Sequence, residues 1–141
     1  MKQRGAPGRA ERFLVEINAM RALYPYSSRS ITLDSSTNIY LAHQQDNLVG
    51  FCEVLLKNTD ISNPRPVFLS LTELHVAPSM QGSGIGTQIM NHLLKMKVPV
   101  ELAIIEKDER AQLLLRRFNY LVKSQVDGIR TIVISGSRQA S

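Results

Sequence analysis

The stretch between residues 67 and 99 constrains the fold more than any other part of the chain. An apolar, β-branched-rich run at 67–76 predicts a strand, and Pro78 ends it because proline cannot donate to a β-ladder. From Ile85 onward, apolar residues recur at helical spacing, and Pro99 stops the helix. Its last turn is expected to carry Lys95 and Lys97. The sequence therefore predicts a strand, a short loop and a helix in direct succession.

The loop between this strand and this helix is rich in glycine. Gly82, Gly84 and Gly86 alternate along it, and each leaves a backbone position without a Cβ, so that a ligand can approach the main chain closely. A helix N-terminus also offers unpaired N–H donors and partial positive charge. A glycine-rich cap without a ligand is the alternative, but each glycine costs about 0.5–1 kcal/mol relative to alanine. The loop therefore predicts a site for a phosphate or diphosphate group.

Two familiar phosphate-binding loops do not fit this spacing. The dinucleotide fingerprint G-x-G-x-x-G requires a third glycine where the chain has Thr87 or, in the next register, Ile89. A Walker A loop requires a Gly-Lys pair, and the sequence contains none. Neither a nicotinamide dinucleotide nor a P-loop nucleotide is supported.

The loop instead resembles the acyl-CoA signature of the GNAT superfamily of N-acetyltransferases. That signature is Arg or Gln, two arbitrary residues, Gly, one arbitrary residue, and Gly or Ala, matched here by Gln81-Gly82-Ser83-Gly84-Ile85-Gly86. The resemblance implies that backbone amides from Gln81 to Thr87 bind the diphosphate of acetyl-CoA. It also implies that the backbone edges of Leu74 and Val76 pair with the pantetheine arm, and that the Val76 amide polarises the thioester carbonyl as an oxyanion donor.

The resemblance places the thioester beside two ionisable residues of the predicted strand. Glu73 and His75 lie on one face of it, opposite to Leu74 and Val76, because side chains alternate along a strand. Either could act as the general base, directly or through a water molecule. The alternatives are an ion-paired strand residue for Glu73 and a packed histidine for His75.

A later helix resembles the second motif of the superfamily. Asp108 takes the place of its usual asparagine and is counted among the CoA-binding residues. The tyrosine that commonly protonates the departing thiolate corresponds to Leu115, which has no proton to donate. Tyr120 or water is expected to replace it.

The acceptor is not specified by the sequence. In the superfamily, the segment after the first helix usually helps to form the acceptor pocket. The corresponding candidates for substrate contact are Tyr24, Tyr26 and Arg29.

The rest of the chain predicts a small mixed α/β domain. The expected elements are a helix at 11–24, a hairpin of 38–43 and 48–56, a strand at 100–105, a helix at 108–118, and a second hairpin of 120–126 and 129–134 about Asp127-Gly128. The resemblance implies a GNAT-like mixed, mostly antiparallel sheet, flanked by helices and splayed at the central strand. The domain is expected at 11–135, with flexible tails at 1–10 and 136–141; the superfamily's usual first strand has no counterpart unless it lies in 1–10.

Charge and composition argue against other classes of protein. The net charge is +5, but residues 1–10 contribute +3 and residues 128–141 contribute +2, which leaves the body between them neutral. This distribution argues against a nucleic-acid-binding domain. No apolar run is long enough to span a membrane. The single cysteine, Cys52, reads as a small core residue that cannot form an internal disulfide, which favours a cytoplasmic location.

The sequence therefore predicts an enzyme that moves an acetyl group from acetyl-CoA directly to a primary amine, without a metal. His43 and His92 have no metal-ligand spacing with other histidines or cysteines. Relatives are commonly dimeric, so a homodimer is an open expectation. The alternative is a CoA-binding or sensing module with little or no turnover, which the leucine at position 115 motivates.

Overall fold

The computed structural model describes residues 13–24, 38–57 and 68–137. Its helices are α2 (Leu14–Ala22), the 3-10 helix η1 (Pro78–Met80), α3 (Ile85–Leu94) and α4 (Glu109–Leu115). Its strands are β1 (Asn38–Gln44), β2 (Asn47–Lys57), β3 (Phe68–Val76), β4 (Val100–Ile105), β5 (Phe118–Val126) and β6 (Ile129–Ser137).

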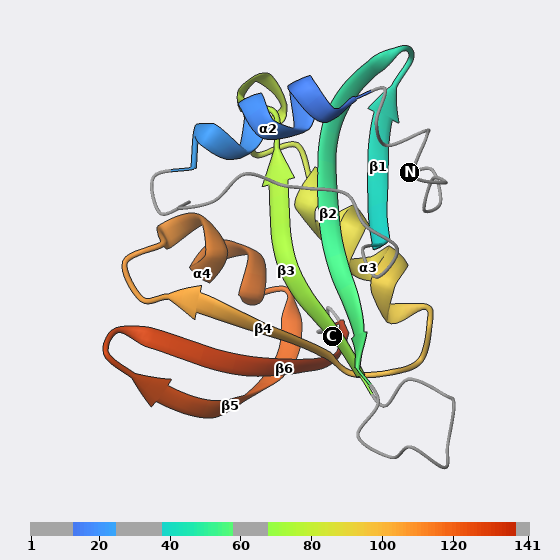
Figure 1. Cartoon of the computed structure of the whole chain (residues 1–141). Helices are drawn as coiled ribbons and strands as arrows, with labels where there is room; N and C mark the ends of the chain where they lie inside the picture. Colours follow the sequence, from blue (N-terminus) through green and yellow to red (C-terminus); the bar gives the residue numbers. More distant parts are fainter. Residues whose placement is uncertain (1–12, 25–37, 58–67, 138–141) are drawn as a thin grey trace. The chain divides into compact units, whose positions relative to one another are not determined.

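The strands follow one another in the order β1-β2-β3-β4-β6-β5 (Figure 1). β3 is parallel to β4, whereas β1 with β2, β4 with β6, and β5 with β6 are antiparallel. The predicted mixed, mostly antiparallel sheet with helices is confirmed. By its internal contacts the chain divides into two compact units, residues 1–54 with 73–89 and residues 55–72 with 90–141. The single domain expected at 11–135 stays a prediction.

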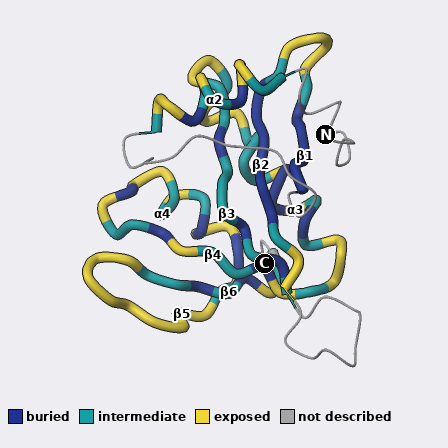
Figure 2. Tube along the Cα trace, in the orientation of Figure 1, coloured by how far each residue is buried: buried dark blue, intermediate teal, exposed yellow. Residues whose placement is uncertain are grey.

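The first unit has its core between α2 and the strands β1 and β2 (Figures 1 and 2). Ile17 of α2 is fully buried against Ile39 and Leu41 of β1 and Phe51 of β2. The helix is shorter than predicted: Phe13, expected within it, is its N-cap, and it ends at Ala22 rather than at Tyr24. In the described ranges, no helix is long and apolar enough to cross a membrane.

Gly50 of β2 lies against the first turns of α3. A Cβ added to Gly50 would lie 3.0 Å from the backbone oxygen of His75, 3.0 Å from Cγ2 of Ile85 and 3.4 Å from Cδ1 of Ile89. Because Phe51 is the next residue of the strand, α2 and the start of α3 cover opposite faces. Glycine at position 50 therefore permits close packing of helix on strand.

Replacing Gly50 by valine is expected to lower the free energy of unfolding by about 1–3 kcal/mol, because the added methyl groups overpack the contact with Ile85. Urea unfolding measures this loss. Gly136→Val in β6 is the matched control, since a Cβ added there meets nothing within 4 Å. Equal destabilisation by both substitutions would contradict the packing role of Gly50.

The second unit contains α4, β4, β5 and β6 and the start of β3. Leu69, Val100, Leu115, Phe118 and Ile132 are among its fully or almost fully buried side chains. The β5–β6 hairpin turns at Asp127 and Gly128, with φ values of 53° and 77°, which is the left-handed backbone that the predicted Asp-Gly turn requires.

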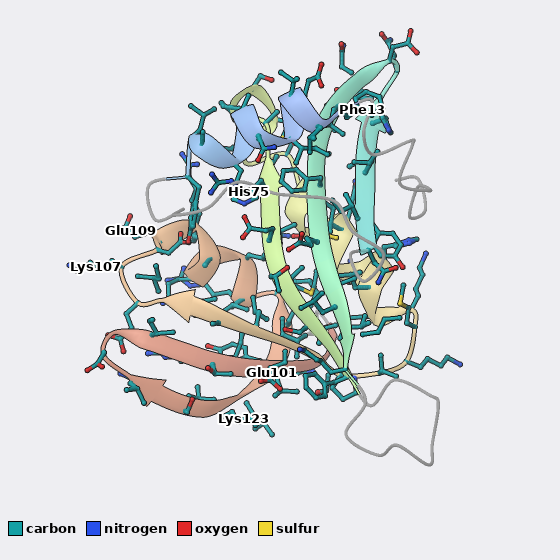
Figure 3. The ribbon with its side chains drawn as sticks, in the orientation of Figure 1. Phe13, His75, Glu101, Lys107, Glu109 and Lys123 are labelled. Atoms are coloured by element: carbon teal, nitrogen blue, oxygen red, sulfur yellow. The ribbon has the colours of Figure 1, made fainter. Side chains whose placement is uncertain are left out.

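β5 closes one end of the strand order and is exposed along most of its length (Figure 2). Near its middle, Lys123 Nζ lies 3.2 Å from Glu101 Oε2 and 5.9 Å from the centroid of the Phe68 ring (Figure 3). These contacts are made at the surface, where an ion pair adds little stability.

Several predicted boundaries are wrong. α3 ends at Leu94, so Lys95 and Lys97 follow the helix rather than occupying its last turn. The Lys97 N–H donates to the Leu94 carbonyl at 3.1 Å, and Lys97 has a φ of 59°, so the chain leaves the helix before Pro99. The first hairpin has a two-residue turn, Gln45 and Asp46, instead of the expected four-residue connection.

The later elements also differ at their ends. α4 ends at Leu115, and Phe118, expected in this helix, begins β5. Gly136 of β6 pairs with Asn119 of β5. The segment expected as a tail from residue 136 therefore begins within the last strand, β6, which ends at Ser137. The expected tail at 1–10, and with it the position of any first strand there, lies outside the described residues.

Candidate active site

The glycine-rich loop joins the end of β3 to α3 through η1. Gly82 has a φ of 84° and Gly84 a φ of 91°, a backbone conformation that residues with a side chain rarely adopt. A Cβ added at either position would meet nothing within 4 Å. These two glycines are therefore required by the conformation of the loop, and they leave its backbone uncovered. Gly86 lies within α3.

The start of α3 presents backbone donors. The Gln88 N–H donates to the Gly84 carbonyl at 3.0 Å, and the amides of Ile85, Gly86 and Thr87 precede this bond in the first turn. First-turn amides have no acceptor within their own helix, and they carry the positive end of its dipole. The first turn of α3 holds no acidic side chain. This helix start therefore favours an anion.

Other donors of the loop are used within it. The backbone N–H of Ser83 donates to the Met80 carbonyl at 3.2 Å, and the Ser83 hydroxyl donates to the same oxygen. The Gln81 side chain donates from Nε2 to the Val76 carbonyl at 3.3 Å. Ser83 and Gln81 thus hold the shape of the loop and tie it to the end of β3.

The two edges of β3 differ near its end. The Ala77 N–H donates to the Val49 carbonyl of β2 at 2.8 Å, and the His75 carbonyl also faces Gly50 of that strand. Backbone groups of successive strand residues point to alternate edges. The N–H groups of Leu74 and Val76 therefore point to the other edge of β3, as expected if they pair with an extended ligand.

Glu73 and His75 lie together on one face of β3, as the alternation predicts. His75 Nε2 lies 3.1 Å from Glu73 Oε1, and their side chains are 8% and 14% exposed. An ionised carboxylate can accept but not donate, so Nε2 carries the proton and donates it to Glu73. Within the described ranges this is the one hydrogen bond of the imidazole, so the neutral form of the ring keeps a free lone pair on Nδ1.

Two aromatic rings contact the imidazole of His75. Figure 3 labels His75. The Phe51 ring stacks on it with centroids 5.2 Å apart and planes at 30°. The Tyr24 ring meets it edge-on at 5.5 Å and 72°. Because Phe51 belongs to the core cluster with Ile17, His75 lies on the face of the sheet that α2 covers. Tyr24, expected to contact the acceptor, is thereby brought to the Glu73–His75 pair.

The remaining predicted site residues belong to the second unit or are not described. Tyr26 and Arg29 are outside the described residues. Asp108 is the N-cap of α4, where its Oδ1 accepts the Ala111 N–H at 3.2 Å. Leu115 is 1% exposed in the second unit, and Tyr120 is half-buried on β5. The cap gives Asp108 a structural role in addition to the CoA-binding role that the family resemblance implies.

Cys52 is completely buried in β2, and burial raises the pKa of its thiol to about 12. At pH 8 the thiol is therefore protonated, and a protonated thiol is a poor nucleophile. We expect no rapid reaction of the folded protein with an aromatic disulfide reagent, and reaction of one thiol per chain in denaturant. Rapid labelling of the native protein would contradict this burial.

Within the described residues, no group of three or more histidine, cysteine, aspartate or glutamate side chains is arranged to hold a metal ion. The candidate site therefore consists of an anion-binding loop, a strand edge with outward N–H groups, and a carboxylate–imidazole pair.

Residues 35–121, more than half of the chain, match the family model for the acetyltransferase (GNAT) domain. The chain belongs to the GNAT acetyltransferase family. The match includes β3, the glycine-rich loop and α3, as well as Leu115 and Tyr120. No curated protein matches the chain significantly.

Several solved structures share the fold of this chain. The putative acetyltransferase yncA of Salmonella typhimurium, determined with its cofactor acetyl-CoA, has a TM-score of 0.70 at 12% identity, covering 99% of this chain and 95% of that one. The protein smu.2055 of Streptococcus mutans has a TM-score of 0.68 at 15% identity, covering 97% and 99%. Arabidopsis thaliana Naa50, in complex with a bisubstrate analogue CoA-Ac-MVNAL, has a TM-score of 0.65 at 18% identity, covering 92% and 94%.

The burial of one charged residue was missed from the sequence. Arg21 follows Ile17 by four residues on α2, which places both on one helix face, and it is 8% exposed. The spacing was a usable signal, but arginine is read as a surface residue by default.

Proposed function

We propose that this chain is an N-acetyltransferase that moves the acetyl group of acetyl-CoA directly to a primary amine. The observation that carries the proposal is the loop in which Gly82 and Gly84 adopt left-handed φ values and open the backbone before α3. Family membership supports the proposal, and structures such as that of yncA with acetyl-CoA support the choice of donor.

In this proposal, the first-turn amides of Ile85, Gly86 and Thr87 bind the diphosphate. The N–H groups of Leu74 and Val76 pair with the pantetheine arm along the edge of β3, as an added strand would. Acetyl-CoA supplies the acetyl group as an activated thioester. The Val76 N–H donates to the thioester carbonyl oxygen and stabilises the negative charge that develops there.

His75 acts as the general base. Its Nδ1 takes a proton from the acceptor amine, while the hydrogen bond from Nε2 to Glu73 keeps the tautomer that leaves Nδ1 free. Glu73 is in this account a positioning residue, and it stabilises the charged imidazole after proton transfer. The thiolate that departs takes a proton from water or from Tyr120, because Leu115 has none to give.

Release of free thiol from acetyl-CoA tests the proposal directly. The full-length protein is mixed with acetyl-CoA and a panel of amines, and thiol is followed with a colorimetric disulfide reagent. Buried Cys52 keeps the protein's own contribution low. Thiol release that depends on an amine, with an acetylated product by mass spectrometry, supports an enzyme. Tight CoA binding without release from any acceptor favours the binding or sensing module instead.

Two further parts of the proposal concern the setting of the protein. A cytoplasmic location is supported by the chain's lone cysteine, which is buried and free. A homodimer is supported by the edge strand β5, where Leu121 and Val126 are 77% and 63% exposed, since such edges favour pairing with another chain. Light scattering on the purified protein measures the oligomeric state.

A further inference from the structure

Arg21 holds a buried positive charge on the inner face of α2. Arg21 is 8% exposed, and neither its Nε nor its Nη1 has a hydrogen-bond partner in the described part of the chain. A guanidinium does not lose its proton in proteins, so the free-energy cost of burying its charge cannot be removed by deprotonation. A buried charge without a partner is strongly unfavourable. An anionic ligand that binds to the guanidinium would compensate this charge.

The neighbours of Arg21 place it beside the Glu73–His75 pair. Ile17, one turn earlier on the same helix face, packs against Phe51. Tyr24, three residues later, meets the imidazole of His75 edge-on, and its N–H donates to the Arg21 carbonyl at 3.0 Å. Since Phe51 and His75 stack on one another, the residues on both sides of Arg21 contact the same pair of rings. Arg21 therefore lies over the face of β3 that carries the proposed base.

No ion pair joins Arg21 to Glu73 among the described residues, where the Glu73 carboxylate accepts from His75. The proposed diphosphate site lies on the loop after β3 and uses backbone amides, so it does not call for this side chain. The remaining ligand that must approach His75 is the acceptor.

We propose that Arg21 binds the carboxylate of the acceptor, so that the acceptors are small amines that also carry a carboxylate, such as amino acids. This inference rests on the proposed function. A planar guanidinium binds a carboxylate through paired, charge-assisted hydrogen bonds. With the carboxylate held at Arg21, the amine is directed to His75 Nδ1. A polyamine would bring a second positive charge to Arg21 and is disfavoured.

Paired acceptors test this inference. The common amino acids are compared with their carboxamides, which keep the amine and remove the negative charge. The wild-type protein is expected to show kcat/KM values at least about tenfold higher for the carboxylates, as one charge-assisted pair predicts. Arg21→Met, which is similar in length and uncharged, is expected to abolish this preference by lowering the values for carboxylates alone. Arg21→Lys is expected to retain part of it.

Stability and binding separate this inference from its rivals. Arg21→Met is expected to be at least as stable to urea as the wild type, because it removes an unpaired buried charge. Marked destabilisation with an unchanged acceptor preference would show an internal partner and overturn the inference. So would equal rates for acids and amides, or a preference for phosphorylated amino alcohols.

Titration calorimetry on the CoA-saturated protein measures amino-acid binding even if the protein has no turnover. Carboxylate-dependent binding of an amino acid that is lost in Arg21→Met would support the site even if no acetyl transfer occurs. Loss of transfer with such binding intact would count against the proposed function alone. Absence of any difference between acid and amide would count against the role of Arg21.

Discussion

Replacing His75 by glutamine is expected to lower kcat for acetyl transfer by roughly 10²–10⁴-fold, the usual contribution of a general base. Glutamine keeps a polar side chain of similar size next to Phe51, but it cannot take a proton from the amine. The dissociation constant for CoA is expected to stay unchanged, because the proposed diphosphate site is formed by backbone amides of another segment. Steady-state thiol release and calorimetry measure the two quantities.

Two variants control this experiment. Glu73→Gln removes the charge that orients and stabilises the imidazole, so a smaller loss of kcat is expected. His43→Ala tests whether loss of any packed histidine has the same effect, since the His43 ring meets Phe13 edge-on at 5.0 Å in the same unit. It is expected to keep its activity. Full kcat in His75→Gln would assign the proton transfer to water or to another residue.

Replacing Gly84 by alanine is expected to weaken CoA binding by about 10- to 100-fold, equivalent to the loss of one or two charge-assisted hydrogen bonds. The new Cβ meets no protein atom within 4 Å, so the space that it fills is the space proposed for the diphosphate. Its backbone, at a φ of 91°, is also strained by a side chain. Calorimetric titration with CoA measures the affinity.

Gly128→Ala separates backbone strain from loss of the ligand site. Gly128 has a φ of 77°, and a Cβ added to it likewise meets nothing within 4 Å, but it lies in the β5–β6 turn of the second unit. Gly128→Ala is expected to lower the free energy of unfolding about as much as Gly84→Ala does. Its affinity for CoA is expected to equal that of the wild type. If both variants lose affinity equally, general destabilisation rather than contact with the ligand explains the effect.

Local chemistry was sufficient to predict the strand–loop–helix segment and both hairpins. Proline at position 78 and the glycines at 82 and 84 act through their own backbone preferences, so their effects are visible without tertiary structure. The predicted end of α3 is wrong because Pro99 is not the residue that stops this helix. The chain leaves the helix at Leu94 through a turn whose left-handed residue is Lys97, an uncommon choice for that conformation.

The features of the candidate site that depend on a single strand could be predicted from the sequence. The features that depend on packing between elements could not. Alternation alone placed Glu73 and His75 on one face of β3. Their hydrogen bond depends on side-chain orientation, and the Phe51 ring that stacks on His75 comes from another strand, so neither followed from the sequence. Arg21 was missed because its burial depends on what α2 covers rather than on its own residue type.

Backbone amide spectra of the isotopically labelled full-length protein show whether the loop before α3 binds the diphosphate of CoA. On addition of CoA, we expect large shifts of the Gly82, Gly84 and Gly86 amide signals, while Gly128 and Gly136 of the second unit serve as internal references. Pantetheine, which lacks the diphosphate, should leave the three loop signals nearly unchanged. Loop signals that do not move at saturating CoA, or that respond equally to pantetheine, would contradict diphosphate binding at this loop.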